Sequence, residues 1–238
     1  MELMAYDIII KSGSVVDGTG APPKFADVGI KGDSIAVIDS LGNGAAKRVI
    51  EAYGKIVAPG LIDITNHSDT HLTLFKYPTL DSMLMQGVTT IIGGNCGGSL
   101  APIASEPAIN AIKKWADPSE INRDWSTTEE YLKSMEDIRP ALNYGTLAGY
   151  GTLRRGVMGD EVRELTFEER EKLKHMLEDS MDQGAFGLSL GLAYGHEYVS
   201  STEEIIEIAK VLREKEGIVK IHLRSEGSGI IAAVNEAV

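Results

Sequence analysis

The chain has 238 residues, of which 43% are apolar and 24% charged, a composition typical of a soluble globular protein with one large domain or a large and a small one. Its net charge of -12 and its pI near 4.9 argue against a broad basic surface for nucleic acid and against docking on an anionic membrane. One cysteine cannot form an internal disulfide, and neither a secretion leader nor an apolar run of roughly 18 to 20 residues is visible, so we expect a cytoplasmic protein.

Residues 6–57 contain short apolar runs separated by turn residues. Ile8, Ile9 and Ile10 precede a break at Ser12 and Gly13, and similar runs follow at 27–33, 35–38 and 48–50. Short strands at this spacing are typical of antiparallel sheets. We therefore predict a small antiparallel β-layer as a first unit, residues 1–57.

After Pro59 the pattern changes to short apolar strands that alternate with longer amphipathic helices. At Thr127, Thr166 and Ser201 a hydroxyl residue stands three positions before a glutamate, a pattern that caps the start of a helix. Alternating strands and helices predict the α/β class, with a parallel sheet or barrel over residues 58–238. The expected strands are 61–65, 88–92, 141–148, 185–190 and 218–223.

Three residues with metal-binding side chains lie at or just past the ends of predicted strands. His67 follows the first strand, Cys96 lies in a glycine-rich loop after the second, and His222 lies at the end of the fifth. Barrel enzymes carry their active sites at the carboxyl ends of their strands. Imidazole and thiolate are good zinc ligands, and a catalytic zinc takes three protein ligands and one open position. These residues therefore indicate a zinc site.

Several motifs occur in a family-like order: Ala58-Pro59-Gly60-Leu61-Ile62-Asp63 before the histidine, then Gln86-Gly87-Val88-Thr89-Thr90, and Gly94-Asn95-Cys96-Gly97. Together they resemble the N-acyl-D-amino-acid deacylases (D-aminoacylases) of the amidohydrolase superfamily. The resemblance runs from about Tyr6 to Val238. It implies a (β/α)₈ barrel preceded by part of a β-sandwich, and a zinc-dependent hydrolase that cleaves the amide bond of N-acyl amino acids, with D-configured substrates expected.

The resemblance also assigns the metal ligands. Cys96 matches the family's metal-binding cysteine, His67 the second histidine of its His-x-His motif, and His222 the histidine after strand five. Thr65 stands at the first histidine of that motif. Because threonine is a poor zinc ligand, we expect one zinc ion and a weakened second site. A further ligand histidine and the catalytic aspartate, the general base, are expected beyond residue 238.

Other residues of the resembling segments are weaker candidates. Asp63 and Asp69 flank His67 and are expected to orient it without binding metal themselves. Ser189 and Tyr194 belong to a segment that resembles the family's strand-four substrate region, and Arg224 follows His222 in a family-like run. We expect these three to contact the substrate.

The five predicted strands fall short of the eight in a complete barrel. A barrel open at strand five exposes a sheet edge, and the apolar pattern of residues 230–238 needs cover. We therefore expect the chain to be the N-terminal part of a split enzyme, in a hetero-oligomer with a second chain that supplies the remaining strands and sandwich.

Three alternatives remain. A cyclic-amide hydrolase of the hydantoinase or dihydroorotase type usually holds two metals and keeps both motif histidines, so Cys96 and Thr65 argue against it. A nucleophilic cysteine lacks any surrounding signature of a cysteine hydrolase. The third is a non-catalytic structural or regulatory subunit, which Thr65 and the missing base favour.

Overall fold

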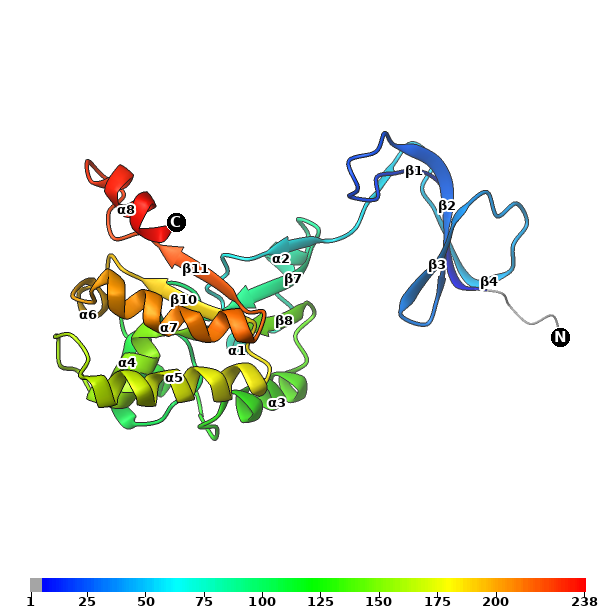
Figure 1. The fold of residues 1–238 in the computed structure, drawn as a ribbon. Helices are drawn as coiled ribbons and strands as arrows, with labels where there is room; N and C mark the ends of the chain where they lie inside the picture. Colours follow the sequence, from blue (N-terminus) through cyan, green and yellow to red (C-terminus); the bar gives the residue numbers. More distant parts are fainter. Residues whose placement is uncertain (1–5) are drawn as a thin grey trace. The chain divides into compact units, whose positions relative to one another are not determined.

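The computed structural model describes residues 6–238, which divide into two compact units. The first unit ends at Gly60 and the second runs from Leu61 to Val238, so the division falls three residues after the predicted boundary. Each unit is described by itself below. The second unit alternates strands and helices, and the predicted α/β class is confirmed for it (Figure 1).

The first unit is a mixed five-stranded sheet, not the purely antiparallel layer that the sequence predicted. Strand β1 pairs antiparallel with β2, and β2 with β3, but β4 and β5 both run parallel to β1. The prediction was wrong because the chain after β3 passes to the other side of β1 and does not turn back on β3. The strands are β1 (Tyr6–Val15), β2 (Lys24–Lys31), β3 (Ser34–Asp39), β4 (Ala46–Glu51) and β5 (Ile56–Val57).

A bulge keeps β1 continuous across the break that was predicted at Ser12 and Gly13. The register with β2 shifts between Ile10 and Gly13, and Ser12 adopts a φ of 59°. The amide of Ser12, which would otherwise lose its ladder partner, donates to Asp27 Oδ1 at 2.8 Å. The extra residue is absorbed by a bulge, as is common in antiparallel pairs.

The second unit contains parallel strands in sequence order. They are β6 (Leu61–Asp63), β7 (Val88–Gly93), β8 (Asn143–Thr146), β9 (Ala148–Gly149), β10 (Gly187–Gly191) and β11 (Ile218–His222). One sheet has the order β6-β7-β8 and the other β11-β10-β9, with every pair parallel. Residues 143–149 therefore serve both sheets, with an interruption at Leu147, whose amide donates to Gly93 O at 3.1 Å.

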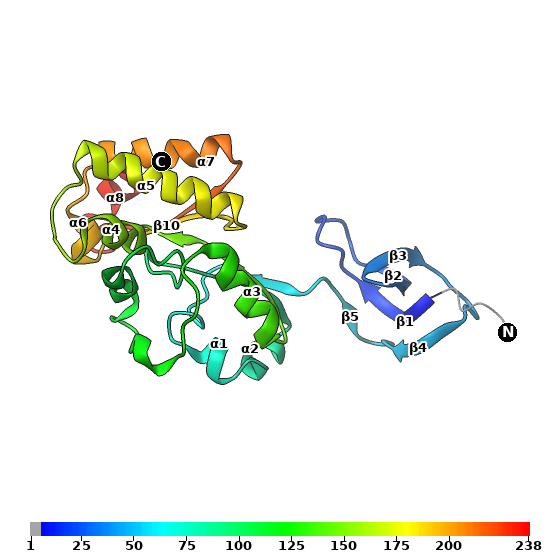
Figure 2. The same ribbon diagram turned by 90° about the horizontal axis from the view of Figure 1, so that it is seen from below.

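Helices follow the strands, and two of the predicted starts are complete capping boxes. Thr127 and Glu130 exchange hydrogen bonds at the start of α3, as do Thr166 and Glu169 at the start of α5. Helices α5 and α7 lie side by side in both views (Figures 1 and 2). The helices are α1 (Thr73–Lys76), α2 (Asp81–Leu84), α3 (Thr128–Ile138), α4 (Tyr150–Met158), α5 (Phe167–Asp182), α6 (Gly195–Tyr198), α7 (Thr202–Glu214) and α8 (Ile230–Ala237), with 3₁₀ turns at Glu106–Ile112 and Pro118–Glu120.

Helix α7 starts at the predicted cap, but its glutamate has a different role. Ser201 accepts a hydrogen bond from the amide of Glu204, whereas the Glu204 carboxylate points into the core. There it pairs with Arg154 of α4 and accepts from the hydroxyl of Tyr150, while its Oε2 accepts from the amide of Leu165 at 3.1 Å. Arg154 is fully buried, so this ion pair ties α4 to α7 inside the protein. Along residues 6–238, every helix is too short or too polar to span a bilayer.

Candidate active site

The loop after β6 places His67 at the carboxyl end of the strands. Asn66, which is buried, accepts hydrogen bonds from the amide and hydroxyl of Ser68 through its side chain. Asn95 from the next strand's loop donates to Asn66 O at 2.8 Å and to Ile92 O at 2.7 Å. The two loops are thereby joined, and His67 is left half-buried between them.

The loop after β7 turns sharply, and the turn needs glycine on both sides of Cys96. Cys96 itself has a φ of 54°, between Gly94 at 71° and Gly97 at 73°. A Cβ on Gly94 would collide with the carbonyl of Leu147, and one on Gly97 with the carboxylate of Glu197. The backbone therefore approaches its neighbours too closely for a larger residue, and the turn presents the Cys96 thiol beside the first loop.

Cys96 and His67 are in contact, as the positions of the two strand ends predicted. Cys96 Sγ lies 3.5 Å from His67 Nε2, and His67 Nδ1 lies 3.2 Å from Thr70 Oγ1. Burial, followed by the charges of His71 and Lys220, lowers the pKa of His67, so the imidazole is neutral at pH 7. Burial also raises the pKa of the Cys96 thiol. A protonated thiol is a poor nucleophile, which argues against a cysteine hydrolase, whereas a cation would convert it to a thiolate.

His222 belongs to the same edge of the sheet but makes different contacts. It ends β11 opposite Gly191 of β10, and its Nε2 lies 3.4 Å from Glu226 Oε1. Two aromatic side chains, Tyr194 and Trp115, lie between the rings of His222 and His67. The ring centroid of His222 is 5.2 Å from that of Tyr194. The Tyr194 centroid is 6.0 Å from that of Trp115, and the Trp115 centroid is 4.9 Å from that of His67. Nowhere in residues 6–238 do three His, Cys, Asp or Glu side chains converge as a metal-binding group.

Thr65, at the position where the resembling family has histidine, is bound by a lysine. Lys220 Nζ lies 2.8 Å from Thr65 Oγ1 and also donates to Ile64 O. Burial lowers the pKa of Lys220, and the nearby Cys96 and Asp63 side chains oppose this shift only in part. A positive charge from the protein itself therefore lies beside the Cys96 and His67 pair.

The two predicted orienting aspartates do not contact the His67 ring. Asp63 accepts from the amide of Thr65 at 2.9 Å and from Asn66 Nδ2 at 2.8 Å. Asp69 is fully buried, accepts from the amide of Gly94 at 2.6 Å, and has its pKa raised to about 6 by burial. The prediction assigned them to the wrong partner because short polar loops use carboxylates to hold backbone N–H groups.

Of the three residues predicted to contact substrate, Tyr194 alone has a side chain without a structural hydrogen bond in the described chain. Ser189 is buried, accepts from the amide of Gly97 at 3.1 Å and donates to Gly94 O, so it supports the Cys96 loop. Arg224 pairs with Glu236 at 2.7 Å and donates to Ser200 O at 3.0 Å. These contacts indicate structural roles for Ser189 and Arg224.

Sequence reasoning missed Lys114 and Lys220. Lys220 lies two positions before His222 on the same strand, and residues two apart on a strand share a face, so its presence at the site was readable from the pattern. Lys114 comes from the long segment between β7 and α3, and its Nζ lies 3.1 Å from Cys96 O. No local pattern brings residue 114 back to residue 96, so this contact needed the structure.

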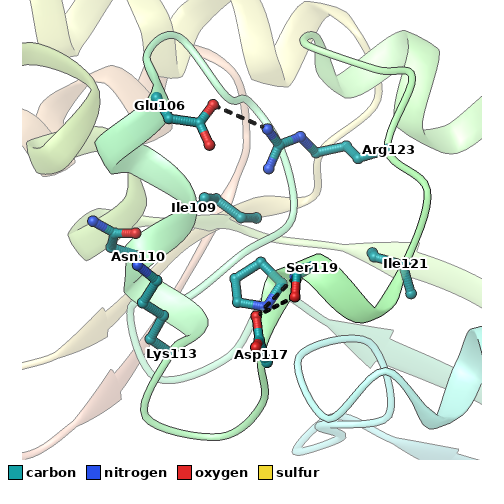
Figure 3. A pocket seen from close by; sticks show the side chains of 9 residues that line it. Glu106, Ile109, Asn110, Lys113, Asp117, Ser119, Ile121 and Arg123 are labelled. Atoms are coloured by element: carbon teal, nitrogen blue, oxygen red, sulfur yellow. Dashed lines mark hydrogen bonds and ion pairs between the residues drawn. The ribbon is translucent and has the colours of Figure 1, made fainter.

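The same long segment contains a cavity of about 380 Å³ that is separate from this site (Figure 3). An ion pair of 3.3 Å between Glu106 and Arg123 crosses one side of it, and Asp117 accepts from the amide of Ser119 at 2.9 Å. No predicted site residue lines this cavity. Its lining residues are Glu106, Ile109, Asn110, Lys113, Asp117, Pro118, Ser119, Ile121 and Arg123.

Two neighbouring buried residues, His196 and Glu197, should give opposite pH effects on stability. Burial raises the pKa of Glu197 to about 7 and lowers that of His196 to about 4. Glu197 therefore stabilises the fold at low pH, and this contribution is lost as pH rises from 4.5 through 7. His196 stabilises it above pH 6.5, and this contribution is lost as pH falls through 4. Between pH 4.5 and 6.5 the opposite pH dependences of stability due to Glu197 and His196 nearly cancel.

We expect Glu197→Gln to remove the fall in stability with rising pH that Glu197 causes, and His196→Gln to remove the rise that His196 causes. Relative to the wild type, the free energy of unfolding of Glu197→Gln should rise with pH by at most about 1.4 kcal/mol per pH unit between 4.5 and 6.5, and that of His196→Gln should fall by as much. Urea unfolding at three pH values measures both. Parallel pH profiles for the two variants and the wild type would show that neither group titrates abnormally.

The chain, with Cys96 and His67 paired at the strand ends of its second unit, matches the α/β fold of amidohydrolase-like D-aminoacylase structures. No family model matches the chain. It is 36% identical to a D-aminoacylase of Alcaligenes xylosoxydans xylosoxydans over 233 residues, 97% of this chain and 47% of the relative. It is also 36% identical to an N-acyl-D-glutamate deacylase of the same organism over 230 residues, 97% of this chain and 46% of the relative.

Solved structures of deacylases are also similar to this chain. A crystal structure of D-aminoacylase matches with a TM-score of 0.84 at 35% identity, over 97% of this chain and 48% of that one. A second solved structure is that of an N-acyl-D-glutamate deacylase from Bordetella bronchiseptica, complexed with zinc and a phosphonate mimic of the tetrahedral intermediate. It matches with a TM-score of 0.87 at 34% identity, over 98% of this chain and 48% of that one. Another D-aminoacylase study describes a binuclear centre with one-metal activation and second-metal attenuation. The chain is thus a homologue of the N-acyl-D-amino-acid deacylases and spans about half the length of the curated relatives it matches.

Proposed function

We propose that this chain carries the metal-binding part of a hydrolase that cleaves the amide bond of N-acyl-D-amino acids. The observation that carries the proposal is the 3.5 Å contact between Cys96 Sγ and His67 Nε2 at neighbouring strand ends. Homology over 97% of the chain to deacylases of this substrate class supports it. A structural role alone does not require a thiol and a neutral imidazole to meet beside two lysines.

The donors present fit a soft divalent cation such as zinc. Cys96 and His67 would hold it, because thiolate and neutral imidazole are the ligands zinc prefers, and His222 is the third candidate. A zinc ion bound there would supply a Lewis acid for the amide carbonyl and a bound water of lowered pKa. His67 is already fixed through its contact with Thr70, and a ligand whose other nitrogen is held binds metal in a defined orientation.

A single metal ion is the form we propose, because Lys220 contacts Thr65 where a second metal would need a ligand. The ammonium of Lys220 lies 2.8 Å from Thr65 Oγ1 and repels a dication placed beside it. We expect about one zinc ion per assembled protein in the wild type, and the same for Thr65→His and for Lys220→Met alone. The double variant Thr65→His/Lys220→Met should bind close to two zinc ions, because it gains an imidazole ligand and loses the ammonium group that repels the second ion.

Elemental analysis after extensive dialysis measures the four stoichiometries. Two tightly held zinc ions in the wild type, or a second ion gained by Thr65→His alone, would show that Lys220 does not exclude the metal.

The second unit, we propose, is part of a (β/α)₈ barrel that a second polypeptide completes. Strands β6 and β11 each pair on one side only among residues 6–238. Their apolar side chains face solvent: Ile62 is 62% exposed and Ile218 51%, and Ile231 of α8 is 71% exposed. Unpaired strand edges with exposed apolar residues need cover. That polypeptide would also supply the general base and any further metal ligand, across an interface above roughly 2,000 Å², as permanent complexes have.

Co-expression with and without the completing polypeptide tests this arrangement. Alone, residues 1–238 should aggregate or melt without cooperativity, and the partner should rescue a soluble complex of defined mass. A stable, cooperatively melting monomer measured by light scattering would reject it.

The substrate class is tested by turnover of N-acetyl-D-amino acids, their L-enantiomers and hydantoins by the assembled protein with added zinc. Hydantoins are included because 93 residues of the chain are 39% identical to a D-hydantoinase of Rhizobium radiobacter. We expect the D-enantiomers to be hydrolysed fastest. Turnover of hydantoins alone would favour the cyclic-amide alternative, and no turnover with any of the three would favour a non-catalytic subunit.

A further inference from the structure

Glu197 of α6 is buried where the turn at Cys96, helix α4 and strand β10 meet. It is 1% exposed, and its Oε2 accepts from the amide of Gly191 at 2.6 Å. A Cβ on Gly97 or on Gly151 would collide with the same carboxylate. The Glu197 side chain therefore lies directly against the backbone that follows Cys96.

Lys114, from the long segment between β7 and α3, contacts the same turn. Its Nζ lies 3.1 Å from Cys96 O and 3.4 Å from the centroid of the Tyr194 ring. The turn is thus contacted at the carbonyl of Cys96 by Lys114 and at the backbone of Gly97 by Glu197. Two side chains from distant parts of the sequence hold adjacent groups of one turn.

Lys114 and Glu197 also interact as charges. Burial raises the pKa of Glu197 to about 7 and lowers that of Lys114 to about 8, and the charge of each group opposes the shift of the other. Arg154 and Arg155 also favour the ionised form of Glu197, but each is paired with another carboxylate. An apolar side chain would fill the same space without the cost of burying a charge. A carboxylate at this place therefore indicates that its interaction with Lys114 contributes to holding the turn.

The turn needs such support because of its backbone conformation. Cys96 has a φ of 54°, a left-handed conformation that is unfavourable for a residue with a Cβ and persists where the surrounding structure holds it. We propose that Glu197 and Lys114 are positioning residues that together hold this turn, so that Cys96 Sγ stays 3.5 Å from His67 Nε2. The inference rests on the proposed function, because the turn carries a residue that we propose binds the metal.

The first test measures the affinity of the assembled protein for zinc by competition with a coloured chelator. Glu197→Gln keeps the size of the side chain and an acceptor for the amide of Gly191 but removes the charge, and Lys114→Met removes the charge of its partner. Each should weaken zinc binding about 10- to 100-fold, as the loss of residues that support a metal ligand does. The double variant should lose no more than the weaker-binding single variant, because the pair acts as a unit.

Two further lysine variants and a spectrum distinguish positioning from a general loss of stability. Lys114→Arg keeps a cation at the turn and should retain most of the affinity. Lys113→Met is the matched control, because Lys113 is the adjacent lysine and lines the separate cavity, and it should bind zinc as the wild type does. With Co²⁺ in place of zinc, the thiolate absorption band should shift in Glu197→Gln. Unchanged affinity in both single variants, or losses that add in the double variant, would overturn the inference.

Hydrogen exchange of the assembled protein stripped of metal separates this inference from the proposed function. Within residues 94–98 the amides of Gly94 and Gly97 are hydrogen bonded to side chains. Both single variants should lose protection in this segment, while α5 stays as protected as in the wild type. Faster exchange there would support the inference even if the wild type bound no zinc, in which case the proposed function alone would fail. Exchange equal to that of the wild type in both variants would overturn the inference, whatever their activity.

Discussion

Cys96→Ser is expected to lose both its bound zinc and its amide hydrolysis. Cys96 supplies the softest of the candidate ligands and lies 3.5 Å from His67. Loss of residues that merely support a metal ligand typically costs 10- to 100-fold, so loss of the thiolate itself should cost on the order of 100-fold or more in kcat/KM. Zinc content by elemental analysis and turnover of N-acetyl-D-amino acids are measured on the same preparation.

His71→Gln is the control for that variant. The His71 ring lies 6.2 Å from that of His67, but its side chain is exposed and was not assigned to the site. It should keep both metal and activity. If Cys96→Ser kept its zinc while His71→Gln lost it, the assignment of the ligands would be wrong.

Arg154→Met and Glu204→Gln are expected to give the largest losses of stability. The two side chains pair inside the core at 0% and 1% exposure, and each variant leaves its partner buried without a countercharge. Removing one member of a buried pair typically costs about 3–5 kcal/mol in the free energy of unfolding. The Glu204 variant also weakens the contact with the amide of Leu165. Urea unfolding followed by circular dichroism measures both changes.

The exposed pair of Lys215 and Asp182 provides the comparison. Lys215→Met removes an ion pair that water already screens, so its unfolding midpoint should stay close to that of the wild type. A double variant that replaces both Arg154 and Glu204 with apolar residues should recover part of the loss, because no charge remains buried. Single variants at Arg154 or Glu204 no less stable than Lys215→Met would show that the buried pair does not hold α4 to α7.

The sequence predicted those features of the fold and site that depend on residues close together in the chain or on neighbouring strands. The hydroxyl and glutamate pairs at Thr127 and Thr166 marked helix starts because both bonding groups lie within one turn. The contact between His67 and Cys96 was also predictable, since adjacent parallel strands bring their carboxyl ends to one edge. In each case the partners are fixed by neighbouring backbone.

Contacts between distant segments were not predictable. Lys220 and Thr65 are 155 positions apart, and Glu204 reaches Arg154 across 50 residues instead of completing its cap. The parallel pairing of β1 with β4 depends on the path of the whole chain, because β4 lies on the far side of β1 from β2. A lysine, a glutamate or a strand carries no mark of which remote segment it will meet, so these features required the structure.

The central claim, that Cys96 and His67 together hold a catalytic metal, is tested most directly by the absorption spectrum of the protein loaded with Co²⁺ in place of zinc. A thiolate bound to cobalt gives a charge-transfer band in the near ultraviolet that oxygen and imidazole ligands do not. We predict this band in the wild type, its loss in Cys96→Ser and a shifted spectrum in His67→Gln. A cobalt spectrum without the thiolate band, or one that neither variant changes, would contradict the account.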